Sequence, residues 1–206
     1  IAFKCGEQSI AFGQLAEQMN QLARVLQELG VRKGECVGIY LNRSLETALA
    51  MYGIMQAGAI YVPLDSNAPP KRTKFLLEDC EIRYLITNSS RKRQLRKVFE
   101  EGGQVEAVIG VDGDWPVPTI AWEEVFSAPK VLSRDAPLLG QDLAYIIYTS
   151  GSTGLPKGIM HTHDSGLSYA QLTVGTYQLQ EDDIFGNHSP IHFDISTLGY
   201  FTAPYL

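Results

Sequence analysis

Hydrophobic residues recur along this chain with two alternating periods. Between Leu15 and Leu29 they are spaced three and four residues apart, which predicts a helix with one apolar face that ends at Gly30. The apolar run 36–41 that follows is short and continuous, as expected for a buried strand. The same alternation predicts further strands at 60–64, 84–87, 105–111, 144–148, 158–163 and 184–188, and further helices at 44–58, 69–77, 91–99, 122–126 and 164–172. It therefore predicts an α/β fold of alternating helices and largely parallel sheets.

Local signals add detail to this outline. Ser44 and Asp164 stand where helices begin and are expected to act as N-caps. Residues 2–12 have the pattern of a hairpin, and the stretch 112–141, rich in proline, glycine and acidic residues, is expected to run over the surface. His161 and His163 are two apart on a predicted strand and would share one of its faces. No set of three or four metal ligands can be assembled around them, so no metal site is predicted and their expected roles are packing and hydrogen bonding.

Composition narrows the kinds of partner. The chain has 206 residues and a formal net charge of −6, which argues against a nucleic-acid partner. The basic cluster at 91–97 is typical of a solvated helix face. No apolar run reaches the roughly 18 residues that span a bilayer. The three cysteines are odd in number and lack a C-x-x-C pattern, so we expect reduced thiols in a cytoplasmic protein with no membrane partner.

The sequence TSGSTGLPKG, which follows the predicted strand 144–148, carries the clearest chemistry. Its glycines free backbone N–H groups, its hydroxyl residues add donors and its lysine adds a positive charge, a combination that suits an oligophosphate. The expected phosphate-binding residues are Thr149, Ser150, Gly151, Ser152, Thr153, Gly154 and Lys157. The spacing of glycine and lysine is not that of a Walker loop, and no G-x-S-x-G elbow can be read around the serines. A flexible linker would lack the strands predicted on both sides.

This loop resembles the signature phosphate loop of the adenylate-forming enzymes, and the sequence AGAIYVPLD at 57–65 is similar to a core motif of nonribosomal peptide synthetase adenylation domains. The resemblance implies the use of ATP and Mg²⁺ and gives Lys157 a catalytic role where pyrophosphate departs. It also implies that the adenine- and ribose-binding motifs, the Mg²⁺ ligand and a small C-terminal domain with a catalytic lysine lie beyond Leu206. Residues 1–206 are therefore expected to be the N-terminal part of an AMP-binding adenylation domain, inactive by itself.

A second motif concerns the substrate. Residues 193–196, FDIS, resemble the F-D-x-S motif of adenylation domains that activate amino acids, in which the aspartate meets the ammonium group of the substrate. The expected substrate-binding residues are Asp194, Phe193, Ile195 and Leu198. The apolar neighbours would exclude water, and a carboxylate in such surroundings needs a cation. The alternative is an exposed acid or a helix cap.

Taken as a whole, the resemblance implies ATP-dependent activation of an amino acid as aminoacyl-AMP with release of pyrophosphate. Thioester formation on the phosphopantetheine of a carrier-protein domain would follow in the complete protein. Two alternatives stay open. One is an acyl-CoA or aryl-acid ligase, whose substrate has no amine for Asp194 to neutralise, and the other is a nucleotide-binding module without catalysis.

Overall fold

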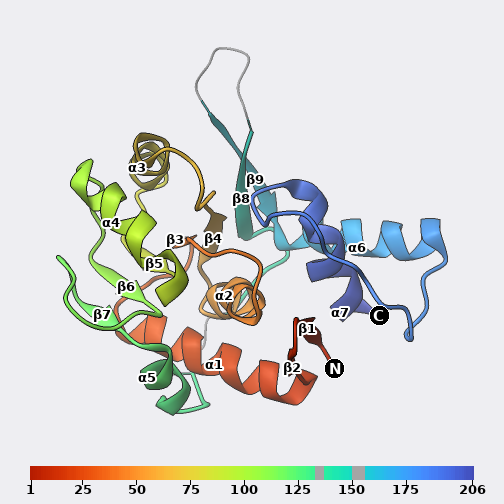
Figure 1. Ribbon diagram of the computed structural model, residues 1–206. Coiled ribbons are helices and arrows are strands. Elements are labelled where there is room, and N and C mark those ends of the chain that lie inside the picture. Colours follow the sequence, from red (N-terminus) through yellow and green to blue (C-terminus); the bar gives the residue numbers. More distant parts are fainter. Residues whose placement is uncertain (133–136, 150–155) are drawn as a thin grey trace.

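The computed structural model describes residues 1–132, 137–149 and 156–206, whose strands form a short hairpin and a seven-stranded sheet (Figure 1). The hairpin pairs β1 (Phe3–Cys5) with β2 (Gln8–Ile10). The strands of the sheet are β3 (Cys36–Ile39), β4 (Ile60–Pro63), β5 (Tyr84–Ile86), β6 (Ala107–Ile109), β7 (Thr119–Ile120), β8 (Leu143–Thr149) and β9 (Lys157–Thr162). Their order is β7-β6-β5-β3-β4-β8-β9, and each neighbouring pair is parallel except β8 and β9. The predicted α/β class with a largely parallel sheet is confirmed.

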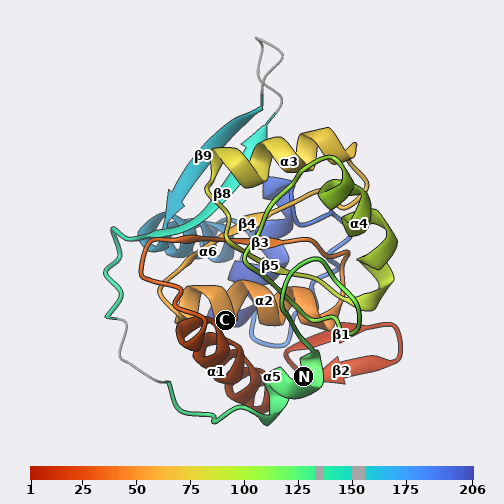
Figure 2. The same ribbon diagram turned by 90° about the vertical axis from the view of Figure 1, so that its left-hand side faces the viewer.

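Helices cover both faces of this sheet (Figures 1 and 2). They are α1 (Phe12–Glu28), α2 (Leu45–Gln56), α3 (Pro70–Asp79), α4 (Lys92–Glu100), α5 (Trp122–Ser127), α6 (His163–Tyr177) and α7 (Ala203–Tyr205), with 3₁₀ turns at Ser89–Arg91 and Asp194–Ser196 and a π-helical turn at Leu198–Thr202. α1, α2 and α5 pack on one face, and α3 and α4 on the other. In β4, Tyr61 joins the first core cluster, whereas Ile60 and Val62 join the second. Because both faces are buried, the strands read as continuous apolar runs.

The segment between α6 and the turn at Asp194–Ser196 differs from its prediction. The expected strand at 184–188 is wrong: these residues have no regular structure, and Ile184 is 97% exposed. A strand persists only where a neighbour completes its hydrogen bonds, and this segment is instead held by side chains. The guanidinium of Arg43 donates hydrogen bonds to the carbonyls of Asn187 and His188.

Two of the local signals also need correction. Asp164 lies in the first turn of α6, and the N-cap is Thr162, whose hydroxyl oxygen accepts a 3.2 Å hydrogen bond from the Ser165 N–H. The stretch 112–141 is not confined to the surface, because α5 inserts Trp122 and Val125 into the core. Ser44 does occupy the N-cap of α2, but it makes no side-chain cap hydrogen bond.

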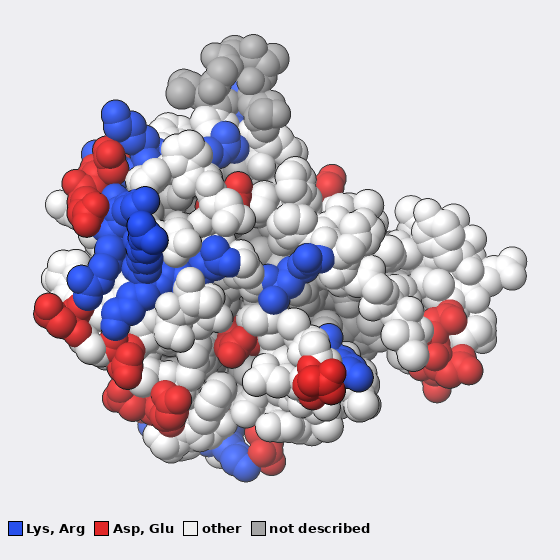
Figure 3. Space-filling model, viewed as in Figure 1, with Lys and Arg blue, Asp and Glu red and all other residues white. Residues whose placement is uncertain are grey.

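Lys and Arg side chains gather over α4 in the space-filling view (Figure 3). Two of them are bound to carbonyl groups of the following loop: Lys92 donates to Asp112 at 3.0 Å and Arg96 to Asp114 at 2.6 Å. Both also lie over the ring of Trp115. These contacts fit a solvated helix face. Within the described ranges, no helix combines the length and apolar character needed to cross a membrane.

Candidate active site on the β8–β9 face

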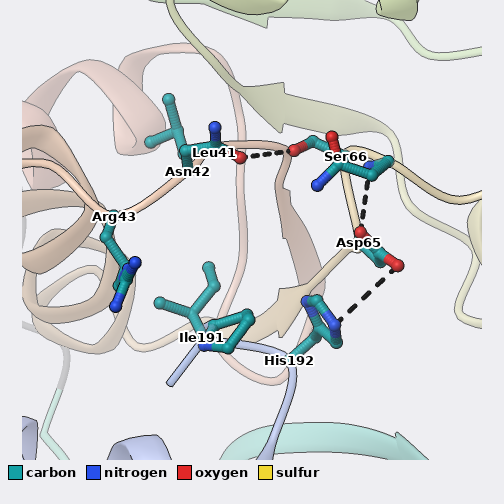
Figure 4. A pocket seen from close by; sticks show the side chains of 9 residues that line it. Leu41, Asn42, Arg43, Asp65, Ser66, Ile191 and His192 are labelled. Atoms are coloured by element: carbon teal, nitrogen blue, oxygen red, sulfur yellow. Dashed lines mark hydrogen bonds and ion pairs between the residues drawn. The ribbon is translucent and has the colours of Figure 1, made fainter. Parts of the chain in front are cut away.

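Parallel strands direct their carboxyl ends to one edge of the sheet, and ligands of open α/β sheets bind beyond that edge. A cavity of about 290 Å³ lies there, between the residues that follow β3, those that follow β4, and the segment 190–192 (Figure 4). Its lining is Leu41, Asn42, Arg43, Asp65, Ser66, Asn67, Pro190, Ile191 and His192. The cavity therefore joins two strand ends to the segment that leads into the FDIS motif.

Polar contacts fix the walls of this cavity. The Ser66 hydroxyl donates to Asn42 Oδ1 at 2.8 Å, which ties the residues after β4 to those after β3. On the other side, His192 Nε2 lies 3.8 Å from Asp65 Oδ2 (Figure 4). Burial lowers the pKa of His192, and the Asp65 carboxylate acts against this shift. Asp65, the last residue of the AGAIYVPLD motif, thus faces the residue that comes two positions before Asp194.

The register of β8 and β9 places two sets of candidate residues on one face of the hairpin. Tyr145 lies opposite His161 and Thr149 lies opposite Lys157. Alternate residues of a strand point to the same side, so all four side chains share a face. Tyr145 itself belongs to the core cluster formed with α1 and α2. This face carries aromatic groups at one end and a hydroxyl and an ammonium group at the other.

Stacked rings form the aromatic end. The imidazole of His161 lies 4.4 Å from the ring of Tyr145 at an interplanar angle of 9°, and Tyr61 and Phe201 stack on Tyr145 at 5.2 and 5.3 Å. Asp194 acts electrostatically on this group. Burial raises the pKa of Tyr145 to about 12, with a further contribution from Asp194. Burial lowers the pKa of His161, and Asp194 acts against that shift.

Asp194 lies in the turn Asp194–Ser196, preceded by Phe193 in extended conformation. Its carboxylate accepts a 2.8 Å hydrogen bond from the Ile195 N–H, so it serves its own turn. The side chains of Phe193 and Ile195 are 53% and 56% exposed, and Leu198 is half-buried. These neighbours do not close over Asp194 in this structure, contrary to the expectation that they would exclude water. Asp194 itself is exposed.

The candidate phosphate-binding residues are only partly described. Thr149 ends β8 and Lys157 begins β9, and both are exposed. Ser150, Gly151, Ser152, Thr153 and Gly154 lie outside the described residues. Thr149 and Lys157 therefore flank the segment 150–155.

The histidines do not share one strand face as expected. β9 ends at Thr162, and His163 is the first residue of α6. His161 has Asp194 as its charged neighbour, whereas His163 has Asp142, Asp164 and Lys33. In the part of the chain that the structure describes, no group of three or more histidines, cysteines or acidic residues could hold a metal ion.

Sequence reasoning missed the contacts that hold the substrate motif in place. Arg43, beside α2, binds the carbonyls of Asn187 and His188, and Asn187 Nδ2 in turn donates to the carbonyl of Ser196 at 3.1 Å. Ile191, buried in the core, fixes the chain between these two points. A short polar segment offers no periodic signal, so only the fold reveals that these residues position Asp194.

Comparison with known proteins identifies the family to which the chain belongs. A family model described as AMP-binding enzyme matches residues 1–206. The chain belongs to the AMP-binding enzyme family. Membership implies the use of ATP, and it confirms the resemblance carried by the TSGSTGLPKG and AGAIYVPLD motifs.

Relatives of this AMP-binding chain include peptide synthetases. It is 37% identical over 197 residues to a linear gramicidin synthase of Brevibacillus parabrevis, covering 96% of this chain and 4% of that protein. It is 30% identical to zwittermicin A synthase ZmaJ of Bacillus cereus, covering 98% of this chain and 35% of that protein. The chain thus spans a small part of these relatives.

Solved structures share the fold. The anthranilate CoA ligase AuaEII in complex with anthranoyl-AMP superposes with a TM-score of 0.83 at 28% identity, covering 96% of this chain and 40% of that one. The Klebsiella oxytoca NpsA N-terminal subdomain with 3-hydroxybenzoyl-AMSN gives a TM-score of 0.73 at 28% identity, covering 96% and 45%. The AMP-binding chain therefore has the fold of the N-terminal subdomain of adenylate-forming enzymes.

Proposed function

We propose that the protein containing this chain activates an amino acid as aminoacyl-AMP and passes the acyl group to the phosphopantetheine thiol of a carrier-protein domain. Asp194 receives the substrate ammonium group, and Phe193, Ile195 and Leu198 contact the rest of the substrate. Thr149, the hydroxyl and glycine residues 150–154 and Lys157 hold the phosphates of ATP. The peptide synthetase relatives support a carrier-protein partner.

The observation that carries the proposal is the shared face of β8 and β9. The charge of Asp194 acts on Tyr145 and His161. Thr149 comes four residues after Tyr145 in β8, and Lys157 comes four residues before His161 in β9, so both project from the same face of the hairpin. At about 3.3 Å per residue, the two ends of the face are roughly 13 Å apart along the strands. An amino acid whose carboxylate meets the α-phosphate of an extended triphosphate spans a length of this order. The ammonium group of the substrate would then lie at the end of the face near Asp194, and the departing phosphates would lie at the end that carries Lys157.

The chemistry follows from these positions. A carboxylate oxygen of the amino acid attacks the α-phosphorus, and the bond to the oxygen that bridges to the β-phosphate breaks, so aminoacyl-AMP forms and pyrophosphate leaves. Negative charge grows on the leaving pyrophosphate, where Lys157 offsets it. Asp194 fixes the ammonium group, which turns the neighbouring carboxylate toward the phosphates. In the second step a thiolate attacks the acyl carbon and AMP leaves.

No protein ligand is assigned here to the Mg²⁺ that ATP brings. Mg²⁺ takes oxygen ligands and usually needs one or two carboxylates besides the phosphates. Among residues 1–132, 137–149 and 156–206, no group of three or more histidines, cysteines or acidic residues could hold a metal ion.

An aryl-acid or acyl-CoA ligase is the second candidate, favoured by the similarity to the anthranilate CoA ligase structure. Amino-acid-dependent exchange of radioactive pyrophosphate into ATP, measured on the complete protein, separates the two. Each amino acid is compared with its des-amino analogue. Activity that requires the α-amino group supports the proposal, and a preference for the des-amino acid or for an aryl acid without an amine would refute it.

A further inference from the structure

His192, the residue that precedes the FDIS motif, faces the residues that follow β4. Its Nε2 atom lies 3.8 Å from Asp65 Oδ2 (Figure 4). The carboxylate of Asp65 is held in place, because its Oδ1 atom accepts a 2.9 Å hydrogen bond from the Asn67 N–H. His192 in turn lies against Phe193, with 4.6 Å between the ring centroids. The pair of Asp65 and His192 thus connects a strand end to the first residue of the substrate motif.

The distance between Asp65 and His192 is longer than a direct hydrogen bond, in which the nitrogen and oxygen atoms lie about 2.7–3.2 Å apart. A polar contact of this length is typical of two groups that share a water molecule. Burial lowers the pKa of His192, with Arg72 acting in the same direction and Asp65 against it. The imidazole is therefore neutral at pH 7, and a neutral imidazole has one N–H donor. A bridging water can accept that proton and donate to the carboxylate of Asp65.

A small cavity lies beside this pair. Its volume is about 30 Å³, and both Asp65 and His192 line it. Such a volume has room for one water molecule. Thr73, on α3, lines the same cavity and is 2% exposed, and its hydroxyl oxygen is buried with no hydrogen-bond partner among the described residues. Buried hydroxyl groups in native proteins are paired with protein or with ordered water, so Thr73 supplies a third group for a water at this place.

The other polar residues of the cavity leave this place to the three. The hydroxyl of Tyr148 donates its proton to the carboxylate of Asp79. Arg72 also lines the cavity but is exposed to solvent. Thr73, Asp65 and His192 remain, and three hydrogen bonds are the usual number for a buried water.

We propose that one water molecule binds Thr73, Asp65 and His192, and that this link positions Asp194 for the carboxylic acid substrate. The water accepts a hydrogen bond from His192 Nε2 and donates to Asp65 Oδ2 and Thr73 Oγ1. The chain from 184 to 193 contains no helix or strand, so side-chain contacts of this kind must hold it. Thr73, Asp65 and His192 are positioning residues, and only the role of Asp194 toward an ammonium group rests on the proposed function.

A high-resolution crystal structure of the complete protein tests the water site directly and requires no substrate. It should show one ordered water within about 3.2 Å of Thr73 Oγ1, Asp65 Oδ2 and His192 Nε2. In Thr73→Val, which keeps the shape of the side chain and removes the hydroxyl, this water should be lost or displaced. A direct hydrogen bond between Asp65 and His192 with no water at Thr73 would overturn the proposal.

Pyrophosphate exchange tests the positioning role, with the carboxylic acid that the complete protein activates best. Thr73→Val and His192→Leu should each raise the KM for that acid about two- to tenfold, the usual effect of one hydrogen bond, and leave kcat and the KM for ATP almost unchanged. His192→Gln keeps an N–H donor and should restore part of the affinity. In the double variant of Thr73→Val and His192→Leu the two effects should not add, because each substitution breaks the same link.

Thr173→Val is the matched control. Thr173 is also buried, but its hydroxyl donates to the Tyr169 carbonyl at 2.7 Å within α6, so this substitution should leave the KM for the acid unchanged. Additive effects in the double variant, or equal effects of Thr73→Val and Thr173→Val, would overturn the positioning role even with the water in place. A preferred acid without an amine would refute the proposed function instead, and the same measurements with that acid would still decide the role of the link.

Discussion

Thr149 and Lys157 lie directly opposite each other across the antiparallel ladder of β8 and β9. Directly opposed residues in such a ladder have Cβ atoms about 5 Å apart and point to the same side. A hydroxyl residue and an ammonium residue therefore lie side by side on either end of the segment 150–155, on the face that also carries Tyr145 and His161. A rigid ladder, rather than the loop alone, sets the place of Lys157.

We expect Lys157→Ala to lower turnover more than amino-acid affinity. Its charge acts where pyrophosphate departs, and loss of one such group typically costs on the order of a hundred- to a thousandfold in rate. Pyrophosphate exchange by the complete protein, with KM measured for ATP and the amino acid, checks this. Lys157→Arg should restore part of the rate, since it keeps the charge. An unchanged kcat with a raised amino-acid KM would assign Lys157 to substrate binding instead.

A second prediction concerns Arg43, which binds the carbonyls of Asn187 and His188. Arg43→Ala releases the segment before Asp194, so the amino-acid KM should rise several-fold while the KM for ATP changes little. Arg96→Ala is the matched control, because Arg96 also donates to a loop carbonyl, at 2.6 Å, but from α4. Equal effects of the two substitutions on the amino-acid KM would remove Arg43 from substrate positioning.

The elements that the sequence predicted well are those whose apolar residues are periodic. The apolar stripe from Leu15 to Leu29 corresponds to α1, and the apolar run at 60–64 corresponds to β4. In both, the pattern of apolar residues matches the side chains that the element buries. The error at 184–188 arose because an apolar stretch such as Ile184–Phe185 has strand propensity but no neighbouring strand to pair with. Strand propensity depends on residues close in the sequence, whereas strand pairing depends on residues far away in it.

In the candidate site, too, local features could be predicted from the sequence and long-range relations could not. The motifs at 149–157 and 193–196 could be recognised in the sequence because their residues are contiguous. The relation between them could not, since it depends on the register of β8 with β9 and on the charge of Asp194 near Tyr145.

Gly110 provides a test of the fold itself. Its φ is +94°, and a Cβ there would lie 2.0 Å from the Thr87 carbonyl oxygen and 2.5 Å from Trp122 Nε1. Gly34 has a similar φ of +83° but open space around it. Gly34→Ala should therefore cost about 1–2 kcal/mol for the backbone alone, whereas Gly110→Ala should add roughly 1–3 kcal/mol for overlap. Comparable losses in thermal unfolding would show that α5 is not packed against Gly110.

Stability should fall in mild acid because three imidazoles resist protonation. Burial lowers the pKa of His161, His163 and His192 from an ordinary value of 6.5. Below that value the unfolded chain binds protons that the folded chain does not, so the free energy of unfolding decreases as pH falls from about 6.5. Urea unfolding at pH 7.5 and 5.5 measures the difference. His161→Phe keeps the stack on Tyr145 and should make the difference between the two free energies of unfolding smaller. A substitution of the exposed His188 is the control. If His161→Phe left this difference unaltered, the account would be contradicted.

The last prediction concerns Asp194 and separates amino-acid activation from the other candidate functions. Asp194 is open to solvent in this structure, so the loss of its contact with an ammonium group should be that of a charge-assisted hydrogen bond, about 1.5–3 kcal/mol. This corresponds to roughly a 10- to 150-fold rise in the amino-acid KM for Asp194→Ala. The KM for ATP should barely change.

The carboxylate also accepts a hydrogen bond from the Ile195 N–H, so Asp194→Ala could act by loosening the turn. Asp194→Asn keeps that acceptor and removes only the charge, which makes it the decisive variant. It should raise the KM for the amino acid nearly as much as Asp194→Ala does. It should leave the KM for a des-amino analogue almost unchanged, because the analogue brings no cation to be neutralised. Pyrophosphate exchange with both substrates measures this directly. If Asp194→Asn behaved like the wild type while Asp194→Ala lost activity toward both substrates, Asp194 would serve the turn and not the ammonium group.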